Sequence, residues 1–325
     1  MKALTLLSGG LDSILAVKLM LKQGIDLVGI NFITPFNISE RKWVDEITKK
    51  FKIPVKTIKL GKDYLKIIKK PKFGYGKHMN PCIDCRIFML KKAKAYAKKI
   101  NASFIVTGDV LGERPMTQTR ESLDIIEKEA GLRGKILRPL SAKLLPETEA
   151  EKKGWVNREK LLDIRGRSRK RQIELAKKYR IKEYPSPAGG CLLTYKEFAD
   201  KVKDLIEHKK KIRMKDIPLL KIGRHFRFGK NKIIVGRNEQ ENKQLLKLKD
   251  TSDYYFEVTG CGSPITILQG TKTKKAIEKA ASLTARYSDS KEKKTPVKYG
   301  KELNKLVIVP PLKNKEIERL RVGKI

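Results

Sequence analysis

The stretch Leu6-Leu7-Ser8-Gly9-Gly10-Leu11-Asp12-Ser13 decides how the first part of the chain folds. Residues 2–7 predict a short apolar strand, residues 8–13 a glycine-rich turn and residues 14–23 a helix. Two glycines let the backbone approach an anion closely, and the amides and dipole of a helix N-terminus favour a phosphate there. Neither GxxxxGK[ST] nor GxGxxG is present, which excludes a Walker A loop and a dinucleotide fingerprint. The alternative is an ordinary strand-to-helix turn capped by one of its own side chains.

The composition is strongly basic. The 325 residues include 75 Lys and Arg against 36 Asp and Glu, a formal net charge of +39. Lys-rich chains occur in thermophile proteins, but there Glu rises as well, and here the acids do not keep pace. A nucleic acid is therefore the favoured partner, because each neutralised phosphate releases counterions. No apolar run approaches the ~18 residues of a membrane span, and the first motif begins too early for a signal peptide. We expect a cytoplasmic protein with no membrane partner.

Strands and helices alternate along residues 1–195. Further strands are predicted at 26–32, 55–59 and 104–107, and helices near 39–51 and 86–99. This alternation predicts an α/β fold with a doubly wound parallel sheet covered on both faces. Ligands of such sheets bind beyond the carboxyl ends of the strands, so Ser8, Asn31 and residues 107–109 are expected to converge.

The pattern changes in the last third of the chain. A helical linker is predicted over 196–222, and short strands follow at 224–228, 232–236, 254–258, 265–268 and 305–309, with a helix near 276–287. We therefore expect a second, smaller α+β domain over 223–325.

Three cysteines form the second informative pattern. Cys82-x-x-Cys85 stands at the start of a predicted helix, and Cys191 ends the Pro- and Gly-rich stretch 185–191. A helix N-terminus lowers thiol pKa values, so Cys85 should be reactive or ligating. Three arrangements stay open: zinc with a nitrogen from His78, a [4Fe-4S] cluster with one open iron, or a persulfide on one cysteine resolved by another. Three unrelated buried cysteines are the structural alternative.

Five motifs occur in the order found in PP-loop tRNA thiolation enzymes. They are SGGLDS at 8–13, NPCIDCRIFMLKKA at 80–93, TGDVLGERPMTQT at 107–119, ILRPLSAK at 136–143 and SPAGGCLLT at 186–194. The first motifs resemble tRNA 4-thiouridine synthetases, and the late Gly-Gly-Cys resembles the tRNA 2-thiouridylases. The resemblance implies cleavage of ATP between the α and β phosphates, with Mg²⁺ on the phosphates. It also implies adenylation of a tRNA uridine and replacement of its oxygen by sulfur from a sulfide or persulfide donor.

The site residues follow from these motifs together with the sheet edge. Asp12, Cys85 and Cys191 are the expected catalytic residues, and Cys82, Cys85 and Cys191 the expected cluster ligands. The expected nucleotide contacts are Leu7, Ser8, Gly9, Gly10, Leu11, Asp12, Ser13, Asn31, Gly108, Asp109 and Gln118. The loop that carries Asp109 and Gln118 could instead be a plain strand-to-helix connection.

Residues 223–325 resemble the NFACT-R type of RNA-binding domain. The resemblance rests on GRHFRFGKNKIIVGRNEQENKQLL at 223–246, DYYFEVTGCGSPITILQG at 253–270 and KAASLTARYS at 279–288. The 4-thiouridine synthetases carry an N-terminal RNA-binding module, whereas this chain begins at the first PP-loop strand, so we expect this domain to hold the RNA. The expected phosphate contacts are Arg224, Arg227, Lys230, Lys232 and Arg237.

Aromatic residues divide between the two expectations. Tyr254 or Tyr255 is expected to stack on a base, and Phe256 to lie in the domain core. Cys261 lies in a predicted tight turn and is assigned no chemistry. Trp155, near the basic residues 165–171, suits either a solvated helix or an RNA contact.

Several alternatives stay open from the sequence. The product is 2-thiouridine or 4-thiouridine. The sequence also allows a homodimer. The rival functions are another ATP-dependent RNA modification with a structural zinc, and a non-catalytic RNA-binding factor.

Overall fold

The computed structural model describes residues 1–38, 42–184 and 190–323. The chain divides into two compact units, Met1–Leu192 and Leu193–Ile325, and each is described by itself. Residues 185–189 of the predicted Gly-Gly-Cys loop and Ser39 of the predicted second helix lie outside the described residues. None of the described helices has the length and hydrophobicity needed to cross a membrane.

Unit 1 is built on a five-stranded sheet in the order β3-β2-β1-β4-β5. The strands are β1 (Lys2–Leu6), β2 (Asp26–Ile33), β3 (Val55–Lys59), β4 (Phe104–Val106) and β5 (Ile136–Leu137). Every pairing between them is parallel, for example Leu4 with Val28 and with Ile105. The order reverses between β1 and β4, so the loops after these two strands share the switch point where ligands bind.

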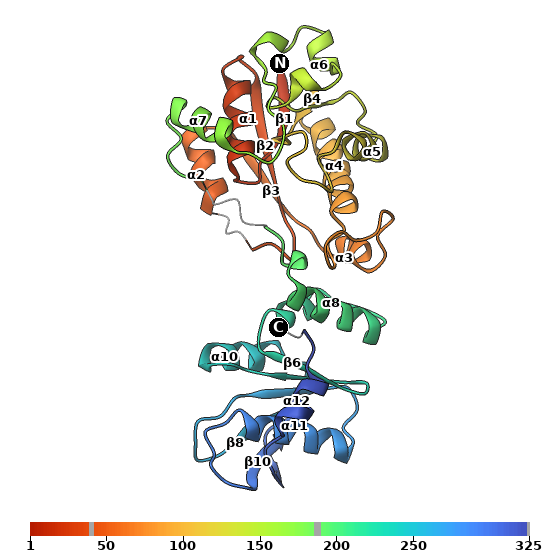
Figure 1. Ribbon diagram of the computed structural model, residues 1–325, viewed down its shortest axis with the longest axis vertical. Coiled ribbons are helices and arrows are strands. Elements are labelled where there is room, and N and C mark those ends of the chain that lie inside the picture. Colours follow the sequence, from red (N-terminus) through yellow and green to blue (C-terminus); the bar gives the residue numbers. More distant parts are fainter. Residues whose placement is uncertain (39–41, 185–189, 324–325) are drawn as a thin grey trace. The chain divides into compact units, whose positions relative to one another are not determined.

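Helices cover both faces of this sheet (Figure 1). They are α1 (Leu11–Leu21), α2 (Lys42–Phe51), α3 (Lys62–Lys69), α4 (Cys82–Lys99), α5 (Arg120–Ala130), α6 (Glu149–Lys152) and α7 (Lys170–Lys178). In Figure 1, α1, α2 and α7 lie on one side of the strands, with α4 and α5 on the other. The predicted doubly wound parallel fold is confirmed.

The sequence placed the first helix too late. It predicted a start at residue 14, whereas α1 begins at Leu11, with Gly10 as its N-cap. Asp12 and Ser13 therefore belong to the first helical turn. The helix is buried almost all round because it lies between the sheet and α7, with Leu11, Leu15 and Met20 fully buried. A helix buried on all sides lacks the amphipathic period that marks where a surface helix begins.

Trp155 is half-buried and packs against the core of unit 1. Its ring stacks on Phe104 of β4 with centroids 6.3 Å apart, and it packs against the main hydrophobic cluster. This packing does not fit the solvated-helix interpretation of the side chain, and the RNA contact stays a prediction.

Unit 2 contains a six-stranded antiparallel sheet in the order β11-β10-β8-β9-β7-β6. The strands are β6 (Arg224–Phe228), β7 (Asn231–Val235), β8 (Tyr254–Val258), β9 (Thr266–Gln269), β10 (Thr295–Gly300) and β11 (Lys305–Val309). The helices are α8 (Lys196–His208), α9 (Asp216–Leu220), α10 (Glu239–Leu248), α11 (Lys274–Arg286) and α12 (Asn314–Leu320).

Both faces of this sheet are buried at β7. Ile233 of β7 joins the cluster formed with α11, and its neighbour Ile234 joins a second cluster with α9 and α10. Successive residues of a strand point to opposite faces, so each cluster covers one face. Phe256 is fully buried in the first cluster, which confirms its predicted place in the core.

The segment 196–222, which the sequence suggested as a linker, folds with the second unit. The boundary of the compact units lies between Leu192 and Leu193. Asp204 of α8 bonds Arg227 of β6 and Lys232 of β7, and this tertiary ion pairing cannot be read from local sequence patterns.

Candidate functional site

The turn between β1 and α1 is open to an anion. Gly9 has φ +84°, which only glycine adopts without strain. Gly10 is the helix N-cap and supplies no side-chain oxygen to the first-turn amides. The Ser13 hydroxyl donates to the Gly10 carbonyl at 2.7 Å, which fixes the turn from within. An uncapped helix start with the dipole behind it favours a phosphate.

The loop after β4 is packed directly against this turn. A Cβ atom on Gly108 would lie 2.5 Å from the Ser13 amide nitrogen and 2.6 Å from the Asp12 carbonyl carbon. Any side chain at this position would collide with the backbone of α1. Glycine at 108 therefore lets the two predicted nucleotide loops meet, as the sequence suggested for Ser8 and residues 107–109.

Asp109 is held inside this loop by two arginines. Its carboxylate is ion-paired with Arg86 of α4, and Arg138 Nε lies 3.7 Å from its Oδ2. Burial acts to raise the pKa of Asp109, but the two guanidinium groups outweigh it and hold that pKa well below its usual range. Asp109 is 6 % exposed. These ion pairs fix the position of the loop, and the nucleotide contact of Asp109 stays a prediction.

Asn31 and Gln118 also support loops. The Asn31 amide donates to the Leu7 carbonyl at 2.8 Å and so ties β2 to the start of the glycine turn. The Gln118 side chain donates to Asp109 at 3.2 Å and accepts from the Arg114 amide at 3.0 Å. Both are buried. The sequence brought them to the right sheet edge and could not show which way their amides face.

Near Asp12, the loop after β4 and the start of α7 also contain buried polar atoms. These atoms have no hydrogen-bond partner of good geometry among the described residues. They are Asp12 Oδ1, Glu113 Oε2, Arg169 Nε and both amide atoms of Gln172. Burial raises the pKa of Asp12, while Arg169 and the neighbouring Gln172 amide lower it. Burial also raises the pKa of Glu113, and the negative charge of Asp12 adds to that rise. Unpaired polar groups buried together are costly unless a ligand completes them.

Glu113, Arg169 and Gln172 were missed as site residues. Glu113 lies within the quoted motif 107–119, and Arg169 within the basic stretch 165–171 that suggested either a solvated helix or RNA. The bridge between Leu111 and Arg165 brings that stretch against the loop after β4. Because this pairing is long-range, sequence patterns gave no signal for it.

Two of the cysteines begin α4 and have polar neighbours. Cys82 is the first residue of the helix, and its sulfur accepts from the Asn80 amide at 3.1 Å. Cys85 lies one turn later, with its sulfur 3.0 Å from the Tyr64 hydroxyl. Cys191 is half-buried beside the Asn37 backbone of unit 1. Cys191 and Cys82 both act electrostatically on Cys85, so the three thiols share one region.

The expected lowering of the Cys85 pKa is wrong. Burial raises the pKa of Cys85 to about 12, because desolvation of a thiolate outweighs the hydrogen bond from Tyr64. Cys85 is the fourth residue of α4, inside the fold, and there desolvation exceeds the favourable helix dipole. Within the described ranges, no group of three or more His, Cys, Asp or Glu side chains, the three thiols included, is arranged to hold a metal.

A continuous set of contacts joins the thiols to the glycine turn. Arg86 directly follows Cys85 and pairs with Asp109, and Asp109 follows the glycine that packs on Asp12 and Ser13. The helix that begins with Cys82 and Cys85 is therefore linked to the glycine turn through the loop after β4.

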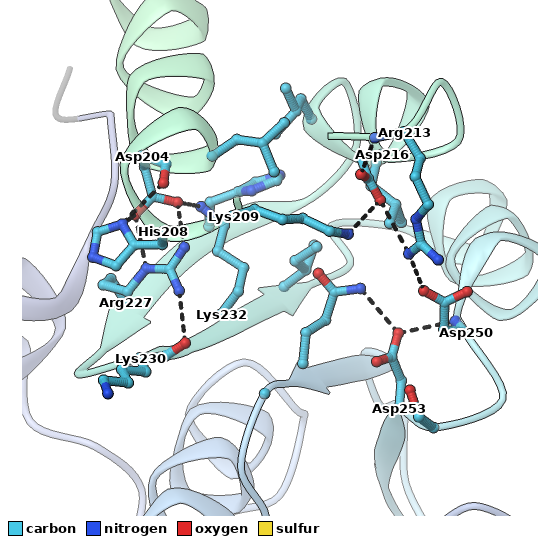
Figure 2. Close-up of a pocket in the computed structure, with 18 of the residues that line it drawn as sticks. Asp204, His208, Lys209, Arg213, Asp216, Arg227, Lys230, Lys232, Asp250 and Asp253 are labelled. Carbon is cyan, nitrogen blue, oxygen red and sulfur yellow. Dashed lines mark hydrogen bonds and ion pairs between the residues drawn. The ribbon is translucent and has the colours of Figure 1, made fainter. Parts of the chain in front are cut away.

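The five basic residues predicted to bind RNA differ in their availability. Arg227 and Lys232 share the Asp204 carboxylate, at 2.7 and 2.5 Å, as Figure 2 shows. Arg237 pairs with Glu241, and the Arg224 guanidinium lies 4.5 Å from the Tyr287 ring centroid. Arg227 and Lys232 thus support the fold through a buried carboxylate, and their phosphate contacts stay a prediction. Lys230 is exposed.

The two tyrosines of β8 are half-buried. Tyr254 packs against Tyr299 with centroids 6.2 Å apart, and Lys249 lies over the Tyr255 ring. Cys261 is exposed in the turn that follows Gly260, which has φ +85°.

Two family models match separate parts of the chain. Residues 1–143 match "Thiamine biosynthesis protein (ThiI)", and residues 223–321 match "NFACT protein RNA binding domain". The chain joins a ThiI-type PP-loop domain to an NFACT-R-type domain. Both predicted resemblances are thereby confirmed.

Curated relatives match the ThiI-type part. A probable tRNA sulfurtransferase of Thermococcus kodakarensis is 33% identical over 146 residues, which cover 43% of this chain and 36% of the relative. A probable tRNA sulfurtransferase of Methanocaldococcus jannaschii is 31% identical over 142 residues, with the same shares. The match therefore spans little more than a third, 36%, of the length of these relatives.

A solved 4-thiouridine synthetase–RNA complex with bound ATP is also similar. It is 22% identical and covers 67% of this chain and 52% of that chain, with a TM-score of 0.39. A superposition this loose carries no information about the site.

Proposed function

We propose that the chain is an ATP-dependent tRNA sulfurtransferase that adenylates a uridine carbonyl and replaces its oxygen with sulfur. The observation that carries the proposal is the packing of the glycine turn, through Gly108 and the Asp109–Arg86 pair, onto the helix that begins with Cys82 and Cys85. Activation and sulfur delivery both need groups at one site. The similarity of residues 1–143 to the ThiI family supports the same function.

ATP would bind with its phosphates on the amides of residues 9–13 at the start of α1. Asp12, with one buried carboxylate oxygen unpaired, and Glu113 suit a Mg²⁺ ion shared with the phosphates, because Mg²⁺ in such sites takes one or two carboxylates plus substrate oxygens. Arg169 faces the same cluster and suits the negative charge that develops on the phosphates.

The reaction needs two displacements. In the first, the uridine carbonyl oxygen attacks the α-phosphorus of ATP, the bond to the β-phosphate oxygen breaks, and pyrophosphate leaves. In the second, a sulfur nucleophile attacks the activated ring carbon, the carbon–oxygen bond breaks, and AMP carries the oxygen away. The sulfur is supplied as sulfide, or as the outer sulfur of a persulfide on Cys85 or Cys191. In the persulfide route the other cysteine then attacks the cysteine sulfur that carries the base, the S–S bond to the base breaks, thiouridine leaves, and a Cys85–Cys191 disulfide remains. An extruded or looped-out uridine suits the first step, since a stacked base hides its carbonyl.

The donor set suits a [4Fe-4S] cluster. Cys82, Cys85 and Cys191 are three thiols in one region, which is the number that a cluster with one open iron takes, whereas structural zinc takes four ligands. A cluster held by these three would supply one open iron site for sulfide. The Tyr64 hydroxyl, 3.0 Å from the Cys85 sulfur, would donate to that thiolate and orient it.

Nucleoside mass spectrometry tests the product. Transfer RNA from a strain lacking this protein should lack one thiolated uridine, whose mass and position name the product. An unchanged nucleoside profile would contradict the proposal. In vitro, the purified protein with ATP, tRNA and sulfide should form AMP in amounts equal to the thiouridine made.

Anaerobic purification tests the metal. A brown protein whose visible absorbance is lost in a Cys82→Ser variant supports the cluster, and a colourless, zinc-loaded protein contradicts it. The control is Cys261→Ser, which alters an exposed thiol of unit 2 and should leave the colour unchanged.

A further inference from the structure

Unit 2 contains a pocket of about 500 Å³ between its first helices and its sheet. One wall is formed by α8, α9 and the turn between them, and the other by β6, β7, β9 and the loop before β8, as Figure 2 shows. The volume is that of a small-molecule site. Residues 204–220 of the first wall precede the region that matches the NFACT model, so this pocket is not made by that domain alone.

Buried carboxylates hold the cations of the wall in place. Asp204 accepts from Arg227 Nε at 2.8 Å and from Lys232 at 2.5 Å, and Asp216 accepts from Lys209 at 2.7 Å. Asp204 and Asp216 are 7 % and 5 % exposed. Side chains fixed in this way lose little rotamer entropy when a ligand arrives, so the wall is pre-organised.

The lining has an excess of positive charge. Six Lys and Arg residues face four Asp residues, a formal charge of +2 with neutral histidines. The cations are Lys209, Lys211, Arg213, Arg227, Lys230 and Lys232. Lys211 and Lys230 are exposed and have no carboxylate partner in the part of the chain that the structure describes. They are the cations left for an incoming anion.

The rest of the lining suits the body of a nucleotide. Leu205, Leu219, Leu220 and Ile234 give it an apolar part. His225 is fully buried there, and its Nε2 lies 2.8 Å from the Ile222 carbonyl as the donor. Its Nδ1 is buried as well and has no hydrogen-bond partner of good geometry among the described residues, so as the second nitrogen of a neutral ring it is an unused acceptor beside the pocket.

We propose that this pocket binds one nucleotide of single-stranded RNA, with a phosphate at Lys211 and Lys230 and the base against the apolar lining. A duplex would not enter, because its bases are stacked and paired. The choice of RNA as the ligand rests on the proposed function. The proposal adds that the helices before the NFACT-R-type domain bind part of the RNA.

The test compares two double variants of the full chain that lose the same charge. Lys211→Ala with Lys230→Ala removes the two pocket cations, and Lys247→Ala with Lys275→Ala removes two exposed lysines of unit 2 outside the pocket. The probe is a fluorescein-labelled oligouridine carrying 5-bromouridine. Its affinity is measured by anisotropy over a range of salt, and its contacts are mapped by photocrosslinking and mass spectrometry. Saturating ATP keeps the proposed ATP site of unit 1 filled.

The pocket variant should bind the oligonucleotide about tenfold more weakly, with a salt slope smaller by roughly one and without crosslinks to residues 204–234. The control variant should keep those crosslinks and lose less affinity. Equal losses in both variants would overturn the proposal, as would equal competition by the matching duplex. The proposal would also be overturned if free UMP competed as strongly, mole for mole, as the unlabelled strand, because a free nucleotide would then be the ligand. AMP formation by the wild-type protein tests the proposed function separately, since oligonucleotide binding needs no catalysis.

Discussion

Asp12 in unit 1 and Asp204 in unit 2 are both buried aspartates, and their surroundings shift their pKa values in opposite directions. Burial raises the pKa of Asp12, and the cations near it do not compensate. Burial acts in the same direction on Asp204, but Arg227 and Lys232 bond it directly and its pKa is lowered. One Asp12 oxygen has no hydrogen-bond partner in the described residues, whereas Asp204 has bonds on both oxygens.

This difference separates a binding group from a structural one. A carboxylate with too few cations is destabilising until a ligand cation arrives, and sites that bind ligands keep such costs. A carboxylate shared by two cations stabilises the fold and has nothing left to offer a ligand. The following predictions test whether the two aspartates differ in this way.

The largest effect is expected from Asp12→Asn. AMP formation should fall roughly 100- to 1000-fold, because a charge aimed at the Mg²⁺ and phosphates is lost. The melting temperature should not fall, since the substitution removes an under-compensated buried charge. Steady-state AMP assays and thermal melts measure the two effects. Asp26→Asn, at the exposed start of β2, is the control, and full activity in Asp12→Asn would remove this aspartate from the mechanism.

Asp204→Asn should act on stability. Breaking a buried pair leaves Arg227 and Lys232 facing each other, and the free energy of unfolding of unit 2 should fall by about 3 kcal/mol. Urea unfolding followed by circular dichroism measures the loss. Asp200→Asn on the same helix should cost far less. A loss no greater than that of the control would mean that Asp204 is not a structural brace.

The sequence predicted the fold better than it predicted side-chain partners. The strand at 55–59 was predicted with the residues that β3 has, and the strands at 224–228 and 254–258 match β6 and β8 as well, since apolar runs between turn residues are local signals. Helix α5, with a strong N-cap at Thr119, and strand β10 were missed.

The hydrogen-bond and ion-pair partners of the side chains were harder to predict, because each pair joins residues far apart in the chain. The sheet-edge rule brought Gly108 to the glycine turn correctly, since it follows from topology alone. Nothing in the local sequence pattern could show that Asp109 forms an ion pair with Arg86, or that Lys232 forms one with Asp204. The expected pKa of Cys85 failed for the same reason: the helix start is visible in sequence, and the burial of the thiol is not.

Arg169→Ala should weaken the interaction with ATP. Arg169 faces the Asp12 cluster from beside α7, and loss of a charge-assisted contact of about 1.5 kcal/mol raises KM for ATP about tenfold. Arg171→Ala is the matched control, because that side chain is exposed and pairs with Asp163. Initial-rate kinetics at varied ATP measure both. An unchanged KM for ATP in Arg169→Ala would place this arginine outside the ATP site. The unpaired oxygen of Asp12 would then need another explanation than a bound ATP.

The smallest effect on stability is expected from His225. This buried base extends the comparison of the two buried aspartates. Burial, together with the charges of Lys232 and Lys201, lowers its pKa well below the usual 6.5. The folded protein therefore keeps His225 neutral as the pH falls from 7 to 5, while the unfolded chain takes up a proton. Stability should fall over this range by at most ~1.4 kcal/mol per pH unit from this residue.

Urea unfolding at pH 7, 6 and 5 measures that slope. It should be flatter in His225→Gln, which keeps an amide donor for the Ile222 carbonyl but does not titrate, than in the wild type. His208→Gln, at a half-exposed ring on α8, is the control. If His225→Gln does not fold, NMR of the wild type decides, because the ring resonances of His225 should not shift down to pH 5. A normal titration near pH 6.5 would mean that solvent or an acid reaches the ring, and that His225 does not present a neutral acceptor to the pocket.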